Sequence, residues 1–253
     1  MIKNRDYVLL SIARPFKDKA NVFFSIGLPV IMYLVIGAAP DYGATRLSHG
    51  TASAYILVGI ALYGGVTAAV STSAMSVVDH FSGWGRMLGT TPLSMSTHII
   101  AQAIAVLLFS LFPVLAVFIT GYLTGAQIDG IGWLTAFVIT WAVSVPFGFY
   151  GLIWAQLVPT PTTIGVAATT VVLLGFAGNL LMPLSKTLLN WAVFTPMFGA
   201  AMLARYPVAE NTHVLDSGFD ESIPMWMAGV NLAVWSVIFV VVAVILSRRD
   251  RNR

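Results

Sequence analysis

Runs of apolar residues without a charged side chain recur along this sequence and are separated by short polar stretches. A helix needs about 20 mostly apolar residues to cross roughly 30 Å of hydrocarbon, and it satisfies its own backbone there. Counting charge-free runs of this length predicts six membrane-spanning helices. The first four cover about 22–39, 51–75, 98–121 and 131–155, the fifth follows Pro159 and Pro161 and ends near Met182, and the sixth covers about 226–246.

The composition agrees with this pattern and excludes water-soluble classes. Apolar residues make up 58% of the chain and charged residues 9%, against roughly 25% charged in ordinary globular domains. Between Arg86 and Lys186 the only charged residue is Asp129. We therefore predict an all-α integral membrane protein with a single domain over residues 1–253. The lack of cysteine excludes disulfides and thiolate metal sites.

The positions of basic residues predict the orientation, because six crossings put both termini on one side. The N-terminal tail, the loop after the second span and the C-terminus carry ten Lys and Arg against four Asp, a net charge of +6. The opposite side carries three basic and six acidic residues, a net charge of −3. The positive-inside rule then predicts cytoplasmic termini. We expect a multi-pass protein of the plasma membrane, in a bacterial cell.

The first apolar run has a second interpretation. Residues 22–39 could be a cleaved signal sequence with Gly37-Ala38-Ala39 as the small-residue site. The preceding 21 residues are longer than a usual n-region, and the apolar run exceeds the usual length of 7–15 residues. A membrane-spanning helix is therefore the favoured interpretation.

Residues 1–21 have the pattern of an amphipathic helix. At 100° per residue, four apolar residues share one arc and charged residues lie opposite. This indicates an interfacial helix on the cytoplasmic leaflet, and the alternative is a disordered basic tail. The apolar arc is Val8, Leu9, Ile12 and Phe16, and the charged face is Lys3, Asp6, Arg14 and Lys17.

The motifs of common enzymes are missing. The sequence contains no GxxxxGK[ST] phosphate loop, no HExxH, no GxSxG and no SxxK. No aspartate or glutamate lies deep within a predicted span, whereas ion-coupled carriers usually keep ionisable groups near the midplane. Asp79, His80 and His98 are the candidates for a catalytic cluster at the membrane interface.

The polar residues inside the predicted spans are few and uncharged. Gln102, Asn179 and Asn231 are expected to form hydrogen bonds between helices. Asn179 follows a Gly-Phe-Ala-Gly stretch at 175–178 that permits close backbone approach. Phe176 and Asn179 are therefore candidates for a substrate path.

Two further segments have patterns that helix packing alone does not explain. In 76–94, Phe81, Trp84 and Leu88 at i, i+3 and i+7 could insert into a groove on a soluble partner, or they could anchor the end of a span in the interface. In 183–225, an apolar stretch is interrupted by polar residues, Pro and Gly, which predicts two half-inserted helices. The acidic stretch 210–221 is predicted to be a solvated loop.

These two segments resemble the permease subunits of type-2 ATP-binding-cassette (ABC) exporters. In that family the loop between spans two and three reads roughly Glu-Arg, then Gly, then a spaced basic or polar helix, then Thr-Pro-Leu-Ser. At the matching places stand Asp79-His80, Gly83, Arg86 and Thr91-Pro92-Leu93-Ser94, with aspartate and histidine in place of the usual glutamate and arginine. The stretch with Leu181-Met182-Pro183, Trp191 and Thr195-Pro196 is similar to the family's re-entrant segment.

The predicted fold therefore has an interfacial helix at 1–21, five spans within 22–182, re-entrant half-helices and a loop at 183–225, and the sixth span with a basic tail at 226–253. The resemblance adds a cytoplasmic coupling helix that docks on a separate ATPase. The docking residues would be Asp79, His80, Phe81, Gly83, Trp84, Arg86, Leu88, Thr91, Pro92, Leu93 and Ser94. The interfacial helix, with Val8, Leu9, Ile12, Arg14, Phe16 and Lys17, would be a connecting element.

The function implied by the resemblance is export of an amphipathic drug, lipid or lipid-linked compound. This chain would not be an enzyme and would hold no cofactor, because ATP and Mg²⁺ would bind the ATPase. A second permease chain, identical or related, would complete the path, and nucleic acid would not be a partner. The alternatives are an ion-coupled secondary transporter and an integral membrane enzyme that modifies lipids.

Overall fold

The computed structural model describes residues 4–38, 41–79, 95–160, 162–215, 218–220 and 223–251. Most of these residues are helical, as predicted, and the single sheet in this part of the chain is a small antiparallel pair of strands. The elements are α1 (Asn4–Lys17), α2 (Lys19–Val22), the π-helix η1 (Phe23–Gly27), α3 (Leu28–Ile36), the 3-10 helix η2 (Asp41–Ala44), α4 (Ala52–Asp79), α6 (Met95–Leu123), α7 (Gly132–Ser144), α8 (Phe147–Leu157), α9 (Thr162–Ala177), α10 (Lys186–Ala192), α11 (Pro196–Ala209), β1 (His213–Leu215), β2 (Gly218–Asp220) and α12 (Met225–Arg251).

In the described part of the chain, five helical segments are long and apolar enough to cross a membrane, which fits a multi-pass membrane protein. α9 has 16 residues, or about 24 Å at 1.5 Å per residue, and is shorter than the roughly 30 Å of a hydrocarbon core. α10 and α11 meet at a bend of 104° and could form one broken span or a re-entrant loop. The five segments are Lys19–Ile36, Ala52–Val78, Ile99–Leu123, Gly132–Leu157 and Met225–Arg248.

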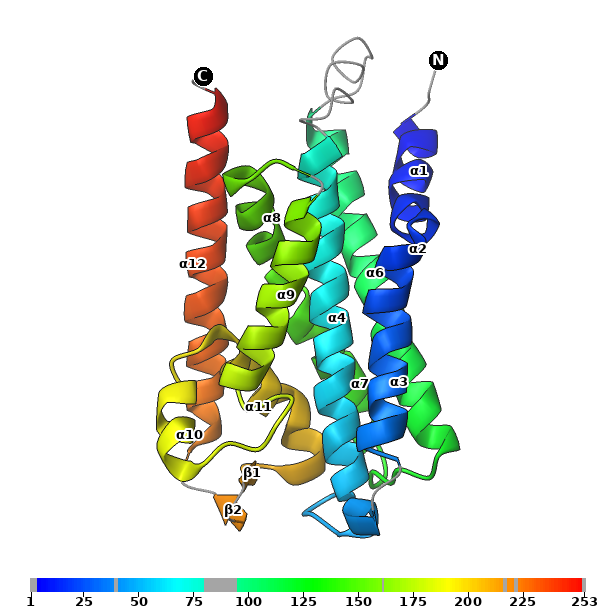
Figure 1. Cartoon of the computed structure of the whole chain (residues 1–253), viewed down its shortest axis with the longest axis vertical. Coiled ribbons are helices and arrows are strands. Elements are labelled where there is room, and N and C mark those ends of the chain that lie inside the picture. The colour runs from blue at the N-terminus through cyan, green and yellow to red at the C-terminus, as the bar shows by residue number, and fades with distance from the viewer. Residues whose placement is uncertain are drawn as a thin grey trace.

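The helices form an elongated bundle with two distinct ends (Figure 1). α1 begins and α12 ends at one end, here called the terminal end, where the C-terminal end of α4 and the N-terminal end of α6 also lie. The opposite end, here called the far end, carries η2, α10, α11 and the two strands. Both chain termini therefore lie at the same end of the bundle.

α4 forms the centre of the bundle, between α3 and α6 on one side and α8 and α9 on the other (Figure 1). In its most apolar stretch 94% of the residues are buried, whereas the corresponding value for α12 is 11%. Small residues permit this close packing. A β-carbon at Gly151 of α8 would collide with the carbonyl oxygen of Val70, so the two helices touch through their backbones.

α1 and the first span are separated by a helix break at Asp18. Asp18 caps α2, and its side chain accepts hydrogen bonds from the backbone N–H groups of Ala20 (3.0 Å) and Asn21 (3.1 Å), which satisfies donors that a helix start leaves open. The Asn21 side chain donates in turn to the Pro15 carbonyl (3.3 Å). A π-helical turn at η1 then leads into α3. These local bonds join α1 to the span without a continuous helix.

α1 forms as a helix, but its buried face overlaps the predicted apolar arc only in part. Tyr7, Ser11 and Pro15 are buried, whereas Leu9 is 55% exposed. Phe16 packs edge-on against Phe109 and Phe112 of α6, with ring centroids 4.8 Å apart in both pairs. α1 therefore lies against a neighbouring helix, and the i, i+4 spacing of its buried residues decides the contact.

The predicted fourth span is divided in two. α7 ends at Ser144 and α8 begins at Phe147, with Pro146 between them. Proline has no N–H to donate and its ring clashes with the preceding turn, so the helix is interrupted at this point. The span predicted over 131–155 is nevertheless confirmed, because Gly132–Leu157 as a whole is long and apolar enough to cross a membrane.

The predicted fifth span ends earlier than expected, at Ala177 and not near Met182. Asn179 takes a left-handed backbone conformation with φ of 56°. The Leu180 N–H then bonds back to the Gly175 carbonyl at 2.9 Å. Helices commonly end where the residue just past them takes a left-handed conformation, and that residue is usually Gly and sometimes Asn.

The acidic stretch 210–221 is not simply a solvated loop, contrary to the prediction. β1 pairs with β2 within it, and His213 and Leu215 are 5% and 7% exposed. Leu215 also forms a bridge with Leu184. The apolar residues of β1 are covered because this strand lies against the end of the bundle.

Candidate functional site

Arg205 is a cation buried inside the far end of the bundle. It lies in α11 and is 7% exposed. Its guanidinium donates to the carbonyls of Asn179 and Leu180, both at 2.7 Å. It also donates to the carbonyl and hydroxyl oxygens of Tyr55, both at 3.3 Å, and lies 4.0 Å from the centre of the Tyr55 ring. These four residues are called the Arg205 cluster.

The local sequence explains why the cluster forms. The left-handed turn at Asn179 ends α9 and leaves the carbonyls of Asn179 and Leu180 as acceptors for Arg205. A cation near a helix C-terminus is also favoured by the helix dipole. On α4, Gly59 lies one turn after Tyr55, and a β-carbon there would collide with the guanidinium. Glycine at this position therefore makes room for the arginine side chain.

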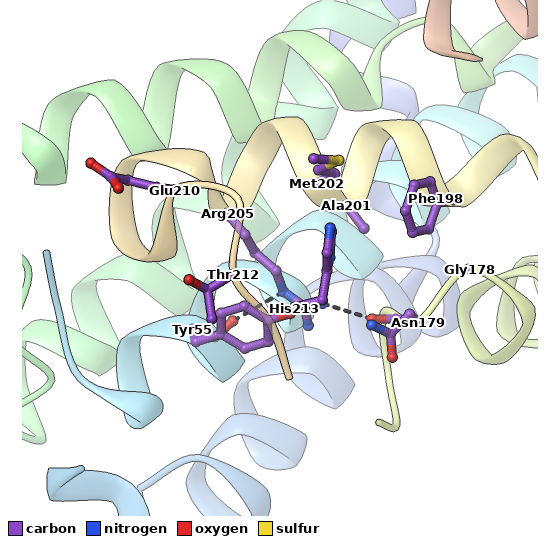
Figure 2. A pocket seen from close by; sticks show the side chains of 10 residues that line it. All are labelled: Tyr55, Gly178, Asn179, Phe198, Ala201, Met202, Arg205, Glu210, Thr212 and His213. Carbon is purple, nitrogen blue, oxygen red and sulfur yellow. Dashed lines mark hydrogen bonds between the residues drawn. The ribbon is translucent and has the colours of Figure 1, made fainter. Parts of the chain in front are cut away.

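A small cavity adjoins the cluster (Figure 2). Its volume is about 10 Å³, which is at the lower limit for one water molecule, so no organic substrate fits in this conformation. The lining also contains Phe198 and His213, whose ring centroids are 5.6 Å apart. The lining residues are Tyr55, Gly178, Asn179, Phe198, Ala201, Met202, Arg205, Glu210, Thr212 and His213.

The hydrogen-bond partners of Arg205 in the described part of the chain are all uncharged. Glu210 lines the cavity, but its carboxylate accepts a hydrogen bond from His49 Nε2 at 2.8 Å, and both side chains are about half exposed. A buried charge is costly unless its hydrogen bonds are satisfied. The Arg205 cluster therefore acts as a structural junction that ties α11 to α4 and to the end of α9.

A second group of polar contacts holds the bend between α10 and α11. This bend, residues 193–195, is called the apex. The side chain of Asn231 in α12 donates to the carbonyls of Val193 (2.7 Å) and Thr195 (3.0 Å), and Trp235 Nε1 donates to the Phe194 carbonyl (3.0 Å). Three consecutive carbonyls are thus satisfied from α12. The predicted interhelical role of Asn231 is confirmed.

The loops at the far end are joined to one another. Arg46 pairs with Asp129 at 3.2 Å, which links the loop before α4 to the loop before α7. The backbone N–H groups of His49 and Asp129 bond to the carbonyls of Val208 (3.0 Å) and His49 (2.8 Å). These contacts join the loops before α4 and α7 to the end of α11.

The residues predicted for the ATPase interface lie mostly outside the described residues. Asp79 is the last residue of α4, and its side chain is not among those described. Ten predicted interface residues fall between the described ranges 41–79 and 95–160: His80, Phe81, Gly83, Trp84, Arg86, Leu88, Thr91, Pro92, Leu93 and Ser94.

The two residues predicted for a substrate path are not brought together. Asn179 is buried in the Arg205 cluster, and its side-chain oxygen accepts a hydrogen bond from the Leu184 N–H at 3.0 Å. Phe176 is 45% exposed on the outer face of α9. Sequence reasoning missed Arg205 and Tyr55, because Arg205 was counted among the loop charges. The sequence did indicate that Arg205 is unusual, because it is the only charged residue of the apolar segment 196–209.

No group of three or more potential metal ligands occurs within the described ranges. No family model matches the chain, and no curated protein matches it in sequence. The structure thus defines a helical protein suited to a membrane, with a buried polar network at its far end.

Proposed function

We propose that the chain is the membrane-spanning subunit of an ATP-driven exporter of the type-2 ABC class, which moves an amphipathic drug, lipid or lipid-linked compound. The observation that carries the proposal is the bent pair α10–α11, which lies between α9 and α12 at the end opposite both termini. It agrees with the re-entrant segment implied by the sequence resemblance.

The proposal counts six crossings, with α9 as the fifth. The order of the elements supports this count, because α3, α4, α6, α7 with α8, α9 and α12 run alternately between the two ends (Figure 1). The shortness of α9 is compatible with a crossing if the bilayer thins locally or the short helix is covered by neighbours. An even number of crossings agrees with both termini lying at one end.

The contacts of the apex support a re-entrant pair. At about 1.5 Å per residue, Asn231 and Trp235 lie roughly 8 and 14 Å along α12 from Trp226. The apex that they contact would then lie within the membrane beside α12, which is itself largely exposed. Irregular backbone is tolerated at such depth only when its polar groups are satisfied. Asn231 and Trp235 supply the donors that the apex needs.

The terminal end would face the ATPase. α4 ends and α6 begins there, so the segment with the resemblance to a coupling helix connects two helices of that end. α1 begins at the same end and could couple motion to α6 through Phe16. ATP and Mg²⁺ would bind the separate ATPase, and a second permease chain would complete the substrate path.

The proposal is tested by reconstituting the chain with its co-purifying ATPase in lipid vesicles. Trp84→Ala and Arg86→Ala should abolish transport while ATP hydrolysis continues, because the coupling contact is lost. The control is Arg46→Ala, which changes an exposed arginine at the far end and should leave coupling intact.

Two results would contradict the proposal. Transport driven by an imposed ion gradient in vesicles that hold this chain alone would identify a secondary carrier. Lipid turnover without an ATPase, lost in His80→Ala, would identify a membrane enzyme.

A further inference from the structure

Residues that weaken or distort a helix lie in four neighbouring segments of the bundle, two of which, α4 and α6, remain continuous helices. The first span has the π-helix η1 followed by Pro29. α4 has the pair Gly64 and Gly65, and α6 has Pro113 inside the helix. α7 and α8 are separated at Pro146. Prolines, π-bulges and glycines are the usual causes of sharp helix bends.

The residues named above lie close to one another. A β-carbon at Gly64 would lie 3.0 Å from Pro113 Cβ, 3.1 Å from Pro29 Cγ and 3.2 Å from the Ser25 carbonyl oxygen. A β-carbon at Gly65 would lie 2.9 Å from Val114 Cγ2 and 3.0 Å from the hydroxyl of Ser144, the last residue of α7. The helix-weakening residues of the four segments therefore lie at a common level of the bundle, called the break layer.

Each of these features lowers the stiffness of its helix at this level. Pro113 has no N–H, so the carbonyl of Phe109 lacks its usual helical donor. Glycine has the greatest backbone freedom of any residue, and Gly64 and Gly65 lie in the central helix that all the other segments contact. π-Helical turns within helices are frequent at sites of functional motion. Four such features at one level lower the resistance to bending more than a single feature would.

The two sides of the break layer are held differently. Toward the far end lie the Arg205 cluster, the contacts of the apex and the Arg46–Asp129 pair. Toward the terminal end, Tyr150 of α8 donates to Thr170 of α9 at 2.8 Å, and Trp141 Nε1 of α7 donates to the Leu107 carbonyl of α6 at 3.0 Å. α12 contains no proline and runs from one end to the other (Figure 1). It therefore provides an internal reference for movement of the other helices.

We propose that the break layer is a hinge at which the terminal halves of the first span, α4, α6 and α8 bend together relative to the far end. Ile99 lies about 21 Å along α6 from Pro113. If the bend angle of α6 at Pro113 changed by about 10°, Ile99 would move by roughly 4 Å. Tyr122, on the other side of Pro113, belongs to the end that the polar network holds.

Spin labels at the two ends test the hinge, and the absence of cysteine allows labels to be placed without background. One pair is Ile99→Cys with Ile245→Cys near the terminal end, and the other is Tyr122→Cys with Trp226→Cys near the far end. All four side chains are exposed. The chain is studied alone in lipid nanodiscs, so the result does not depend on the proposed exporter function.

We expect double electron–electron resonance to give a broad or two-peaked distance distribution for the terminal pair and a single narrow one for the far pair. Pro113→Ala should restore a helical bond, narrow the terminal distribution and shift its mean by about 2 Å or more, with no change in the far pair. Pro15→Ala is the matched control, because Pro15 lies in α1 outside the break layer, and it should leave both distributions unchanged.

Equally narrow distributions for both pairs in the unsubstituted chain would refute the hinge. The same conclusion would follow if Pro113→Ala and Pro15→Ala had equal effects on the terminal pair. If Pro113→Ala does not fold, Gly64→Ala replaces it. The comparison of the two pairs in the unsubstituted chain remains decisive in either case.

Discussion

The two ends of the bundle are stabilised by different kinds of contact. The far end is joined by polar groups, with Arg205 bonded to α4 and the end of α9 and with Asn231 bonded to the apex. The terminal end is joined by close apolar packing, as at Gly151 against Val70 and Phe16 against Phe109. Hydrogen bonds fix geometry because they are directional, whereas apolar contacts are not directional. The far end should therefore keep one arrangement while the terminal end can change.

Replacing Arg205 should have the largest effect on stability. In Arg205→Leu the carbonyls of Asn179 and Leu180 lose their donors while they remain buried. We expect a loss of about 3–5 kcal/mol in unfolding free energy, measured by SDS-induced unfolding in mixed micelles. Arg205→Lys should recover only part of this loss, because an ammonium lacks the planar fork of donors. A loss below that of the exposed control Arg46→Leu would contradict the role given to the cluster.

Removing the side-chain amide of Asn231 should have the next largest effect. Asn231→Leu keeps a similar volume but leaves the carbonyls of Val193 and Thr195 with no donor. We expect a loss of about 2–3 kcal/mol and greater exchange of the amide hydrogens in α10 and α11. Val234→Leu, at an exposed position of the same helix, is the control and should change neither quantity. Equal protection of α10 in the two variants would show that the apex is held by other contacts.

A substitution at Gly151 tests the close packing of α8 against α4 at the terminal end. Gly151→Ala places a methyl group against the Val70 carbonyl oxygen, so α8 must move away from α4 at a cost of about 1–3 kcal/mol. Gly165 in α9 is the matched control, because a β-carbon there would meet no atom within 4 Å. Gly165→Ala should be neutral or slightly stabilising, since alanine is the better helix former. The same SDS titration separates the two outcomes.

The Arg46–Asp129 pair should contribute least. Both side chains are about half exposed, and exposed ion pairs are typically worth about 0.2–1 kcal/mol. A double-mutant cycle with Arg46→Ala and Asp129→Ala measures the coupling energy. It should fall further when salt is added, because surface charges are screened. A coupling energy that salt does not change would mean that the pair is shielded from solvent.

Several elements of the fold were predictable because they follow from local pattern. The helices α4, α6 and α12 are long runs of apolar residues without charge, and the predicted spans coincide with them closely. The short helices before α12 were also predicted, since Lys186 and Pro196 interrupt the apolar stretch. The split at Pro146 could have been predicted from the proline itself. The candidate ATPase interface remains a prediction from sequence resemblance.

The sequence by itself determined that the chain is helical and apolar enough for a membrane, because hydropathy and length depend only on the order of residues. Tertiary structure alone decided that Arg205 is buried, because its acceptors come from residues 26 and 150 positions away in the chain. It also decided which helix is central. α4 and α12 are both long apolar helices, and only packing against neighbours buries 94% of one stretch and 11% of the other.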